Sequence, residues 1–352
     1  MEWNVVTVMS KPKQAAKKTQ VLREDELCPR SLLGGQEKAF AKDIKRYKMR
    51  RREFVAVRCP ACNKKNSKKI FKKFTFIYRE CLVCKTIFMS PRPNARLMRE
   101  YYENSENYRF WAKYIFPASE VVRNEKVNRP RLEQIVEICK KHKIPKNHLV
   151  EIGAGFGAFA ELVKKEESFR SVTVVEPTPE MAAACRARGV QVIPRPVESL
   201  KREISHADVV VAFEVLEHLF DPSVFFRKVA RLIRKKSILV VSCPNGRGFD
   251  IAALGPDSLA VDPEHVNLLN PDSISLLGSR CGFRCLEVRT PGRLDAEYVR
   301  LAALREKINL VGQSLLKRIL LEEWERLGIP FQGFLAENNL SSHMWAVFKK
   351  NG

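Results

Sequence analysis

Short runs of apolar and β-branched residues alternate with segments of helical pattern from residue 149 to the end of the chain. The runs predict strands at residues 149–152, 172–176, 191–193, 208–213, 237–242, 283–288 and 344–348. The segments between them predict helices near residues 157–166, 179–188, 221–234 and 271–281, and a long helical stretch near 294–327. This alternation is typical of an α/β fold with a parallel sheet flanked by helices.

The part of the chain before this pattern divides into three segments. Residues 1–53 alternate Lys/Arg clusters with little apolar periodicity, which predicts a basic, flexible extension. Residues 54–92 contain two cysteine pairs, and residues 93–147 combine a Tyr-rich segment with a helical pattern at 131–141, which predicts a helical linker or substrate cap. The main domain is then expected at 148–350, with a helical insertion at about 290–342 before the last strand.

Composition and charge narrow the class of protein. The chain has 352 residues, of which 45% are apolar, so it is long enough for a sizeable core and is not disordered as a whole. The apolar runs are too short to span a membrane, and the scattered cysteines favour a reducing compartment, so we expect a soluble cytoplasmic protein without a membrane partner. Residues 1–100 carry 26 basic and 9 acidic side chains, so a polyanionic partner would dock there.

The two cysteine pairs have the spacing of a zinc ribbon. Cys59 and Cys62 form one Cys-x-x-Cys pair, Cys81 and Cys84 form the second, and 18 residues separate the pairs. Each tight turn places two thiolates on one side of a tetrahedral ion, and four thiolates leave no open coordination position. The spacing therefore predicts a structural zinc ion, with a redox dithiol as the alternative.

A glycine-rich turn follows the strand predicted at 149–152. Gly153, Ala154, Gly155 and Gly157 lie in this turn, where the backbone can approach a ligand at the start of a helix. The spacing also satisfies a dinucleotide pattern. However, Glu151 would repel a pyrophosphate and attract a cationic ligand such as S-adenosylmethionine.

Two further segments support this ligand. Glu176 ends the next strand, where its carboxylate can accept both ribose hydroxyls, although an exposed strand-end carboxylate is the alternative. After the strand at 208–213, residues 213–219 read Phe-Glu-Val-Leu-Glu-His-Leu.

With these motifs, residues 149–350 resemble the class I S-adenosylmethionine-dependent methyltransferases, which have a Rossmann-like seven-stranded sheet. The resemblance implies that residues 151–157 hold the methionine part of the cofactor and that Glu176 holds its ribose. It also implies that Val197 and Glu198 surround the adenine and that Phe213 and Glu214 form the wall beside the methyl group.

The whole chain also resembles zinc-containing sugar methyltransferases, including nucleotide-sugar C-methyltransferases. The features that carry this resemblance are the cysteine module, the segment Ser90-Pro91-Arg92-Pro93, the Tyr-rich helix and residues 262–267, Asp-Pro-Glu-His-Val-Asn. The resemblance implies a nucleotide-linked sugar that is methylated on the carbon beside a keto group. In that family a tyrosine often precedes the Glu-His pair by two residues, where this chain has Asp262.

Methylation at such a carbon requires a base that removes the α proton. His265, oriented by its neighbour Glu264, is the predicted base. The resemblance implies that His218 stabilises the enolate oxygen and that Tyr108 reaches the sugar. For His265 and His218 the alternative is a purely structural hydrogen bond, and for Tyr108 it is a place in the core.

Two arginines in proline turns, Arg92 and Arg293, could clamp a diphosphate or lie on the surface.

Two other functions remain open. An RNA methyltransferase would use the basic N-terminal third and the zinc module to hold phosphates, although the module has few aromatic residues for stacking bases. Alternatively, the core binds the cofactor without catalysing a transfer. The sequence indicates neither the acceptor atom nor the oligomeric state.

Overall fold

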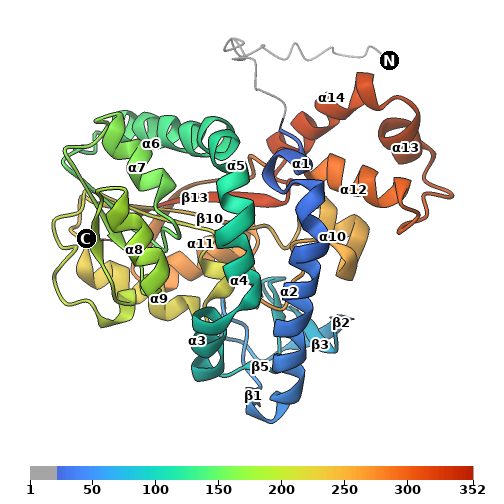
Figure 1. Cartoon of the computed structure of the whole chain (residues 1–352), viewed down its shortest axis with the longest axis horizontal. Helices are drawn as coiled ribbons and strands as arrows, with labels where there is room; N and C mark the ends of the chain where they lie inside the picture. Colours follow the sequence, from blue (N-terminus) through green and yellow to red (C-terminus); the bar gives the residue numbers. More distant parts are fainter. Residues whose placement is uncertain (1–21, 352) are drawn as a thin grey trace, which may run out of the picture.

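A seven-stranded sheet forms the centre of the molecule (Figure 1). The computed structural model describes residues 22–351, and the strand order is β12-β13-β10-β9-β6-β7-β8. The strands are β6 (His148–Ile152), β7 (Ser171–Val175), β8 (Gln191–Ile193), β9 (Val209–Phe213), β10 (Ile238–Pro244), β12 (Phe283–Arg289) and β13 (His343–Lys350). β6 to β10 are parallel, and β13 is antiparallel to both of its neighbours. The predicted α/β fold with seven strands is therefore confirmed.

Helices cover both faces of this sheet. One face packs against α6 (Arg129–His142) and α7 (Ala158–Lys165), and the other packs against α9 (Pro222–Leu232) and α11 (Pro271–Arg280). α8 (Pro179–Ala187) packs beside β7 and β8. Side chains of a strand point alternately to the two faces of a sheet. Because helices cover both faces here, every residue of β9 is buried, and its sequence is a continuous apolar run.

The cysteine module shares a sheet with the main domain. Its strands β2 (Ser67–Lys73), β3 (Phe76–Cys81) and β4 (Ile87–Met89) are joined by β11 (Asn267–Leu268), which pairs with β4. β1 (Phe54–Val55) pairs with β5 (Arg92–Pro93). The boundary expected at residue 92 therefore does not separate two independent folding units.

The basic N-terminal segment is helical where the structure describes it, which corrects the expectation of a flexible extension. It forms α1 (Glu24–Leu27), α2 (Arg30–Met49) and a short turn η1 (Arg51–Glu53), whereas residues 1–21 of the predicted extension lie outside the described residues. Tyr47 is buried and stacks on Tyr101 with 4.7 Å between ring centroids. The many Lys and Arg residues on the exposed face hide this short apolar stripe in the sequence.

The expected cap consists of helices that follow one another closely. They are α3 (Ala95–Asn104), α4 (Glu106–Phe110), η2 (Trp111–Ile115), α5 (Phe116–Arg123) and η3 (Asn124–Asn128), which continues into α6. Asp43 of α2 accepts hydrogen bonds from the Ser105 hydroxyl at 2.7 Å and from the Asn107 amide at 2.9 Å. These bonds cap the start of α4 and connect it to α2. The two helices lie side by side in Figure 1.

The helical insertion before the last strand is present. It contains α12 (Asp295–Leu304), α13 (Ser314–Lys317), η7 (Arg318–Glu322) and α14 (Trp324–Glu337), which share an apolar cluster with α10 (Phe249–Leu254). α14 continues ten residues beyond the predicted end at 327 because it accommodates Pro330, a residue that normally ends a helix. None of the helices within residues 22–351 combines the length and the apolar character needed to cross a membrane.

Candidate active site

The turn between β6 and α7 has the backbone geometry of a ligand-binding loop. Gly153, Gly155 and Gly157 have φ values of 74°, 56° and 76°, in the left-handed region. A Cβ atom at Gly153 would lie 2.7 Å from Cγ2 of Val215, whereas one at Gly155 would meet nothing within 4 Å. The loop therefore packs tightly on the protein at Gly153 and is open at Gly155, while Ala154 lies between them.

Glu151 lies at the end of β6, directly before this loop. Its side chain is buried, and its Oε2 atom has no hydrogen-bond partner among the described residues. Burial raises the pKa of Glu151 to about 8, although the Arg131 guanidinium acts in the opposite direction. A buried carboxyl with an unused oxygen would gain from a cationic group placed beside it.

Glu176 follows β7 and bonds to the same loop. Its carboxylate accepts the Gly155 amide at 3.1 Å and the Thr178 amide at 2.9 Å, and burial raises its pKa above the ordinary range. Val197 is buried in the short turn η4 (Val197–Ser199), and Glu198 is exposed there. Among these three side chains, Glu176 is the one that forms a hydrogen bond with the described glycine loop.

Glu214 is held by partners that the sequence did not indicate. It follows β9 with a φ of 53°, and its carboxylate accepts the Ser242 hydroxyl at 2.6 Å. It also forms ion pairs with Arg131 and His343, each at 3.2 Å. Burial opposes ionisation, but these two cations hold the pKa of Glu214 well below its usual range. The three charged residues come from α6, β13 and the end of β9, so no local motif could have connected them.

Arg131 also contacts Phe213, which with Glu214 is predicted to line the site of the methyl group. Its guanidinium lies 4.6 Å from the ring centroid of Phe213, which in turn stacks on Trp345 at 5.5 Å. The neighbouring side chains Phe213 and Glu214 are thus both fixed by Arg131.

The two predicted histidines lie together. The ring centroids of His218 and His265 are 4.8 Å apart, and Tyr102 of α3 packs edge-on against His218. Burial, with a contribution from His265, lowers the pKa of His218 to about 3, so this imidazole is neutral at physiological pH. The structure therefore places His218 and His265 next to each other, although they are 47 positions apart in the sequence.

Glu264 does not orient His265, which corrects that prediction. Its carboxylate bonds to the Tyr101 hydroxyl and to the Asn107 side-chain amide, in the cap. The partner of His265 is instead the backbone carbonyl of Ala260, at 2.9 Å from Nδ1. Because the two residues lie in a turn, their side chains point to different neighbours although they are adjacent in sequence.

Tyr108 faces the glycine loop from the cap. Its ring packs edge-on against Tyr102, and both rings line a cavity of about 20 Å³ together with Phe156 of the glycine loop and Thr178. The cap tyrosines thus lie between the glycine loop and the histidine pair.

Neither of the two arginines in proline turns has the role of an exposed diphosphate clamp. Arg92 is completely buried and donates to the carbonyls of Met89, Phe220 and Val266 and to the side chain of Asn267. Arg293 donates to the carbonyl of Lys126. In particular, Arg92 connects the segment after His218 to the segment after His265.

The four predicted metal-binding cysteines converge. The Sγ atoms of Cys59 and Cys84 are 3.4 Å apart, as are those of Cys62 and Cys81. In each pair the residue after the second cysteine, Asn63 or Lys85, adopts a left-handed conformation with φ of 60° or 59°. This is the turn that the spacing predicted.

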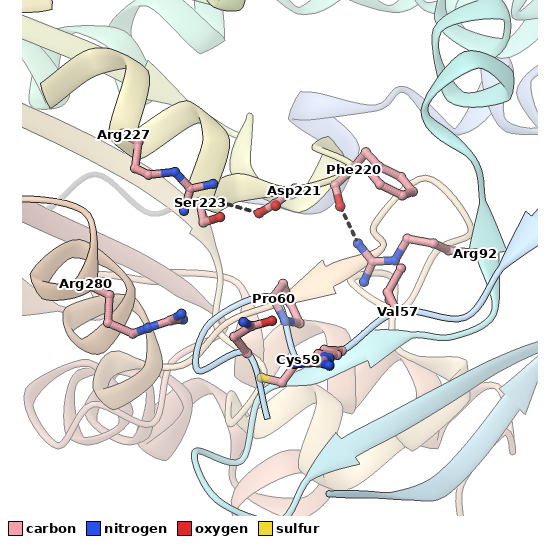
Figure 2. A pocket seen from close by; sticks show the side chains of 11 residues that line it. Val57, Cys59, Pro60, Arg92, Phe220, Asp221, Ser223, Arg227 and Arg280 are labelled. Carbon is pink, nitrogen blue, oxygen red and sulfur yellow. Dashed lines mark hydrogen bonds between the residues drawn. The ribbon is translucent and has the colours of Figure 1, made fainter. Parts of the chain in front are cut away.

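A larger cavity lies beside the first cysteine turn (Figure 2). It has a volume of about 300 Å³, and its basic lining comes from Arg58, Arg227, Arg280 and the buried Arg92. Asp221 and Ser223, at the start of α9, also line it, but no residue of the glycine loop does. The cavity and the histidine pair border the same segment, since Phe220 and Asp221 follow His218 closely.

The strand order and the glycine loop with its two acidic neighbours define the class I S-adenosylmethionine-dependent methyltransferase fold. A model of the methyltransferase domain family matches residues 102–288, more than half of the chain. The chain therefore belongs to this methyltransferase family.

Curated relatives carry names of the same kind. A probable S-adenosylmethionine-dependent methyltransferase of Mycobacterium tuberculosis is 28% identical over 178 residues, which are 50% of this chain and 62% of the relative. A relative from Mycolicibacterium smegmatis is 28% identical over 155 residues, 44% of this chain and 58% of that protein. The chain thus spans about three fifths of the length of these relatives.

Among solved structures, phosphoethanolamine N-methyltransferase 2 of Haemonchus contortus is similar with a TM-score of 0.48 and 16% identity, over 76% of this chain and 63% of that one.

Proposed function

We propose that this protein transfers the methyl group of S-adenosylmethionine to a small acceptor. The observation that carries the proposal is the glycine loop after β6, which is open at Gly155 and directly follows the buried Glu151. The Oε2 atom of Glu151 accepts no hydrogen bond from any residue that the structure describes. The sulfonium and ammonium groups of the cofactor are cations, so either would stabilise the ionised form of Glu151.

The other proposed cofactor contacts lie on the segments that follow β6, β7, β8 and β9. Residues 153–157 would hold the methionine part, and Glu176 would accept the ribose hydroxyls with the lone pairs that its bonds to Gly155 and Thr178 leave free. Val197 and Glu198 would border the adenine, and Phe213 with Glu214 would line the path of the methyl group.

For the acceptor we propose a nucleotide-linked sugar methylated on the carbon beside a keto group. His218 and His265 are the imidazoles available on the acceptor side, and the cap residues Tyr102 and Tyr108 separate them from the glycine loop. In this reaction an imidazole nitrogen takes the proton from the carbon, the carbon attacks the methyl group, and the bond from methyl to sulfur breaks. Arg58, Arg227 and Arg280, which line the 300 Å³ cavity, would attract the diphosphate.

We further propose that a structural zinc ion holds the cysteine module. Four ligands at about 2.3 Å from a tetrahedral ion lie nearly 4 Å from one another, and the two closest sulfur pairs are 3.4 Å apart. Cys59, Cys62, Cys81 and Cys84 are all buried, which suits a closed site. The four residues therefore fit the ion, and its contribution would be to hold the two turns together.

Cofactor binding is tested by titration calorimetry with S-adenosylmethionine. The acceptor is then tested by measuring the transfer of a labelled methyl group. We expect one cofactor per chain and label in 4-keto nucleotide sugars, with weaker acceptor binding in Arg227→Ala and Arg280→Ala. Absence of cofactor binding would refute the proposal. Label in RNA that disappears after nuclease treatment would identify the RNA methyltransferase instead, and binding without transfer to any acceptor would identify a non-catalytic protein.

A further inference from the structure

Glu217, His218 and His265 form a cluster that has the composition of a metal site. One donor atom of each residue lies within 4.8 Å of the others, and the three side chains are buried or half-buried. We propose that this cluster binds a divalent first-row transition-metal ion, which holds an oxygen atom of the methyl acceptor. The site is separate from the four cysteines, and only its role in the transfer rests on the proposed function.

The carboxyl group of Glu217 is buried without a hydrogen-bond partner in the described part of the chain. It is 1% exposed, and neither of its oxygens accepts a hydrogen bond from the described residues. A buried carboxylate without hydrogen bonds is costly, because it loses its hydration without compensation. Nε2 of the neutral His218 lies 3.9 Å from Oε1, which is too far for a hydrogen bond. A cation between these atoms would compensate for the burial.

The spacing suits two ligands of a single ion. Nitrogen and oxygen donors each about 2.1 Å from a metal lie about 3 to 4 Å apart, depending on the angle between them. The 3.9 Å between Glu217 Oε1 and His218 Nε2 falls in this range.

Both histidines are oriented as metal ligands. Nδ1 of His218 lies 3.2 Å from the carbonyl of Glu264, and Nδ1 of His265 lies 2.9 Å from the carbonyl of Ala260. A carbonyl oxygen can only accept, so in each ring the proton is on Nδ1 and the lone pair is on Nε2. Metal-binding histidines characteristically donate their other N–H to a carbonyl in this way.

Hydrogen bonds connect the segment of Glu217 and His218 to the segment of His265. The Val266 amide donates to the carbonyl of Glu217 at 2.8 Å, and the Asn267 side chain donates to the carbonyls of Leu216 and Leu219 at 3.0 and 2.7 Å. Arg92 adds bonds to the carbonyls of Phe220 and Val266. The ligands therefore come from two segments that are cross-linked on both sides of the site.

The ligand set indicates which ions fit and what they would do. Two imidazoles and one carboxylate suit Mn²⁺, Fe²⁺, Co²⁺, Ni²⁺ or Zn²⁺, and three protein ligands leave coordination positions open. An acceptor hydroxyl or keto oxygen at an open position would be stabilised as negative charge develops on it. With the ion bound, the Nε2 lone pairs of His218 and His265 are used for coordination, so this arrangement replaces the role of an imidazole as the base, and the acceptor proton passes to a water molecule.

The test uses Mn²⁺, because four thiolates prefer softer ions and will not compete strongly for it. We expect electron paramagnetic resonance of the full-length protein to show one bound Mn²⁺ per chain, with spin-echo modulation from imidazole nitrogen. Glu217→Gln and His265→Asn should each weaken Mn²⁺ binding at least tenfold. His206→Gln, which changes an exposed histidine outside the cluster, should bind Mn²⁺ as the wild type does.

Cofactor binding by the same variants separates the two proposals. We expect S-adenosylmethionine to bind with unchanged affinity in Glu217→Gln, while methyl transfer by the wild type stops after chelation and returns with Mn²⁺. No bound Mn²⁺, equal binding by all variants, or modulation without imidazole nitrogen would overturn the metal site. Transfer that continues in the presence of chelator would overturn its role in the reaction. The wild-type spectrum decides the question even if a variant does not fold.

Discussion

Replacement of Glu151 by Gln should change both the stability of the protein and its affinity for the cofactor. In the ligand-free protein, burial raises the pKa of Glu151 from 4.5 to about 8. Each pKa unit corresponds to about 1.36 kcal/mol, so ionising this carboxyl in the folded state costs roughly 5 kcal/mol relative to the unfolded chain.

The sign of the pH dependence follows from this shift. Because the folded protein binds the proton more tightly than the unfolded chain, the contribution of Glu151 to stability is complete below about pH 4.5. It is lost progressively as the pH rises to about 8. Gln cannot ionise, so the variant avoids this loss. We expect ligand-free Glu151→Gln to gain up to roughly 5 kcal/mol over the wild type between pH 4 and pH 9.

Cofactor binding should move in the opposite direction. A cation beside Glu151 favours the carboxylate, so binding to the wild type at pH 7 should release most of one proton per chain and become tighter as the pH rises. The variant should bind at least tenfold more weakly, without this pH dependence.

The measurements are denaturant unfolding across the pH range and calorimetry in buffers of different ionisation enthalpy. Glu137→Gln, which changes an exposed carboxylate of α6, is the matched control and should alter neither property. Parallel stability curves for wild type and Glu151→Gln, or equal affinities for S-adenosylmethionine, would refute the reasoning.

Three further predictions concern other parts of the site. Cys81→Ser should abolish binding of the proposed zinc ion and speed hydrogen exchange at the Met89 amide, because this amide of the module donates to the Val266 carbonyl at 3.0 Å; unchanged zinc content by metal analysis would contradict this. Arg92→Met should lower the free energy of unfolding by about 3 to 5 kcal/mol in denaturant titrations, because it removes a buried network of hydrogen bonds. The control Arg96→Met removes an exposed ion pair and should lower the free energy of unfolding by less than about 1 kcal/mol. Glu176→Gln should weaken cofactor binding in calorimetry by about tenfold, since a neutral amide is a poorer acceptor for ribose hydroxyls; an unchanged Kd would argue against the ribose role.

The sequence predicted the main sheet well for a physical reason. Strands such as β9 are buried on both faces, so they appear as uninterrupted apolar runs whose ends are easy to recognise. The turn at residues 153–157 was equally clear, because glycine is the residue type that left-handed backbone requires. The cysteine turns were predictable from spacing alone.

Contacts between distant segments could not be predicted in the same way. Glu264 and His265 are neighbours in the chain, yet their partners come from the cap and from Ala260. The ion pairs of Glu214 join segments more than 80 residues apart. Nothing in the motif at 213–219 shows that Glu217, unlike Glu214, has no hydrogen-bond partner among residues 22–351. The apolar stripe of α2 was hidden because basic residues surround it.

The strand β11 gives residues 22–93 an architectural importance that their small number does not suggest. A truncated chain that begins after β5 would leave β11 as an unpaired edge and would uncover Val261, Val266 and Leu268, which now pack against side chains of the module. A chimaera that moves the module onto another methyltransferase, or exchanges it between relatives, must therefore include the segment that contains β11.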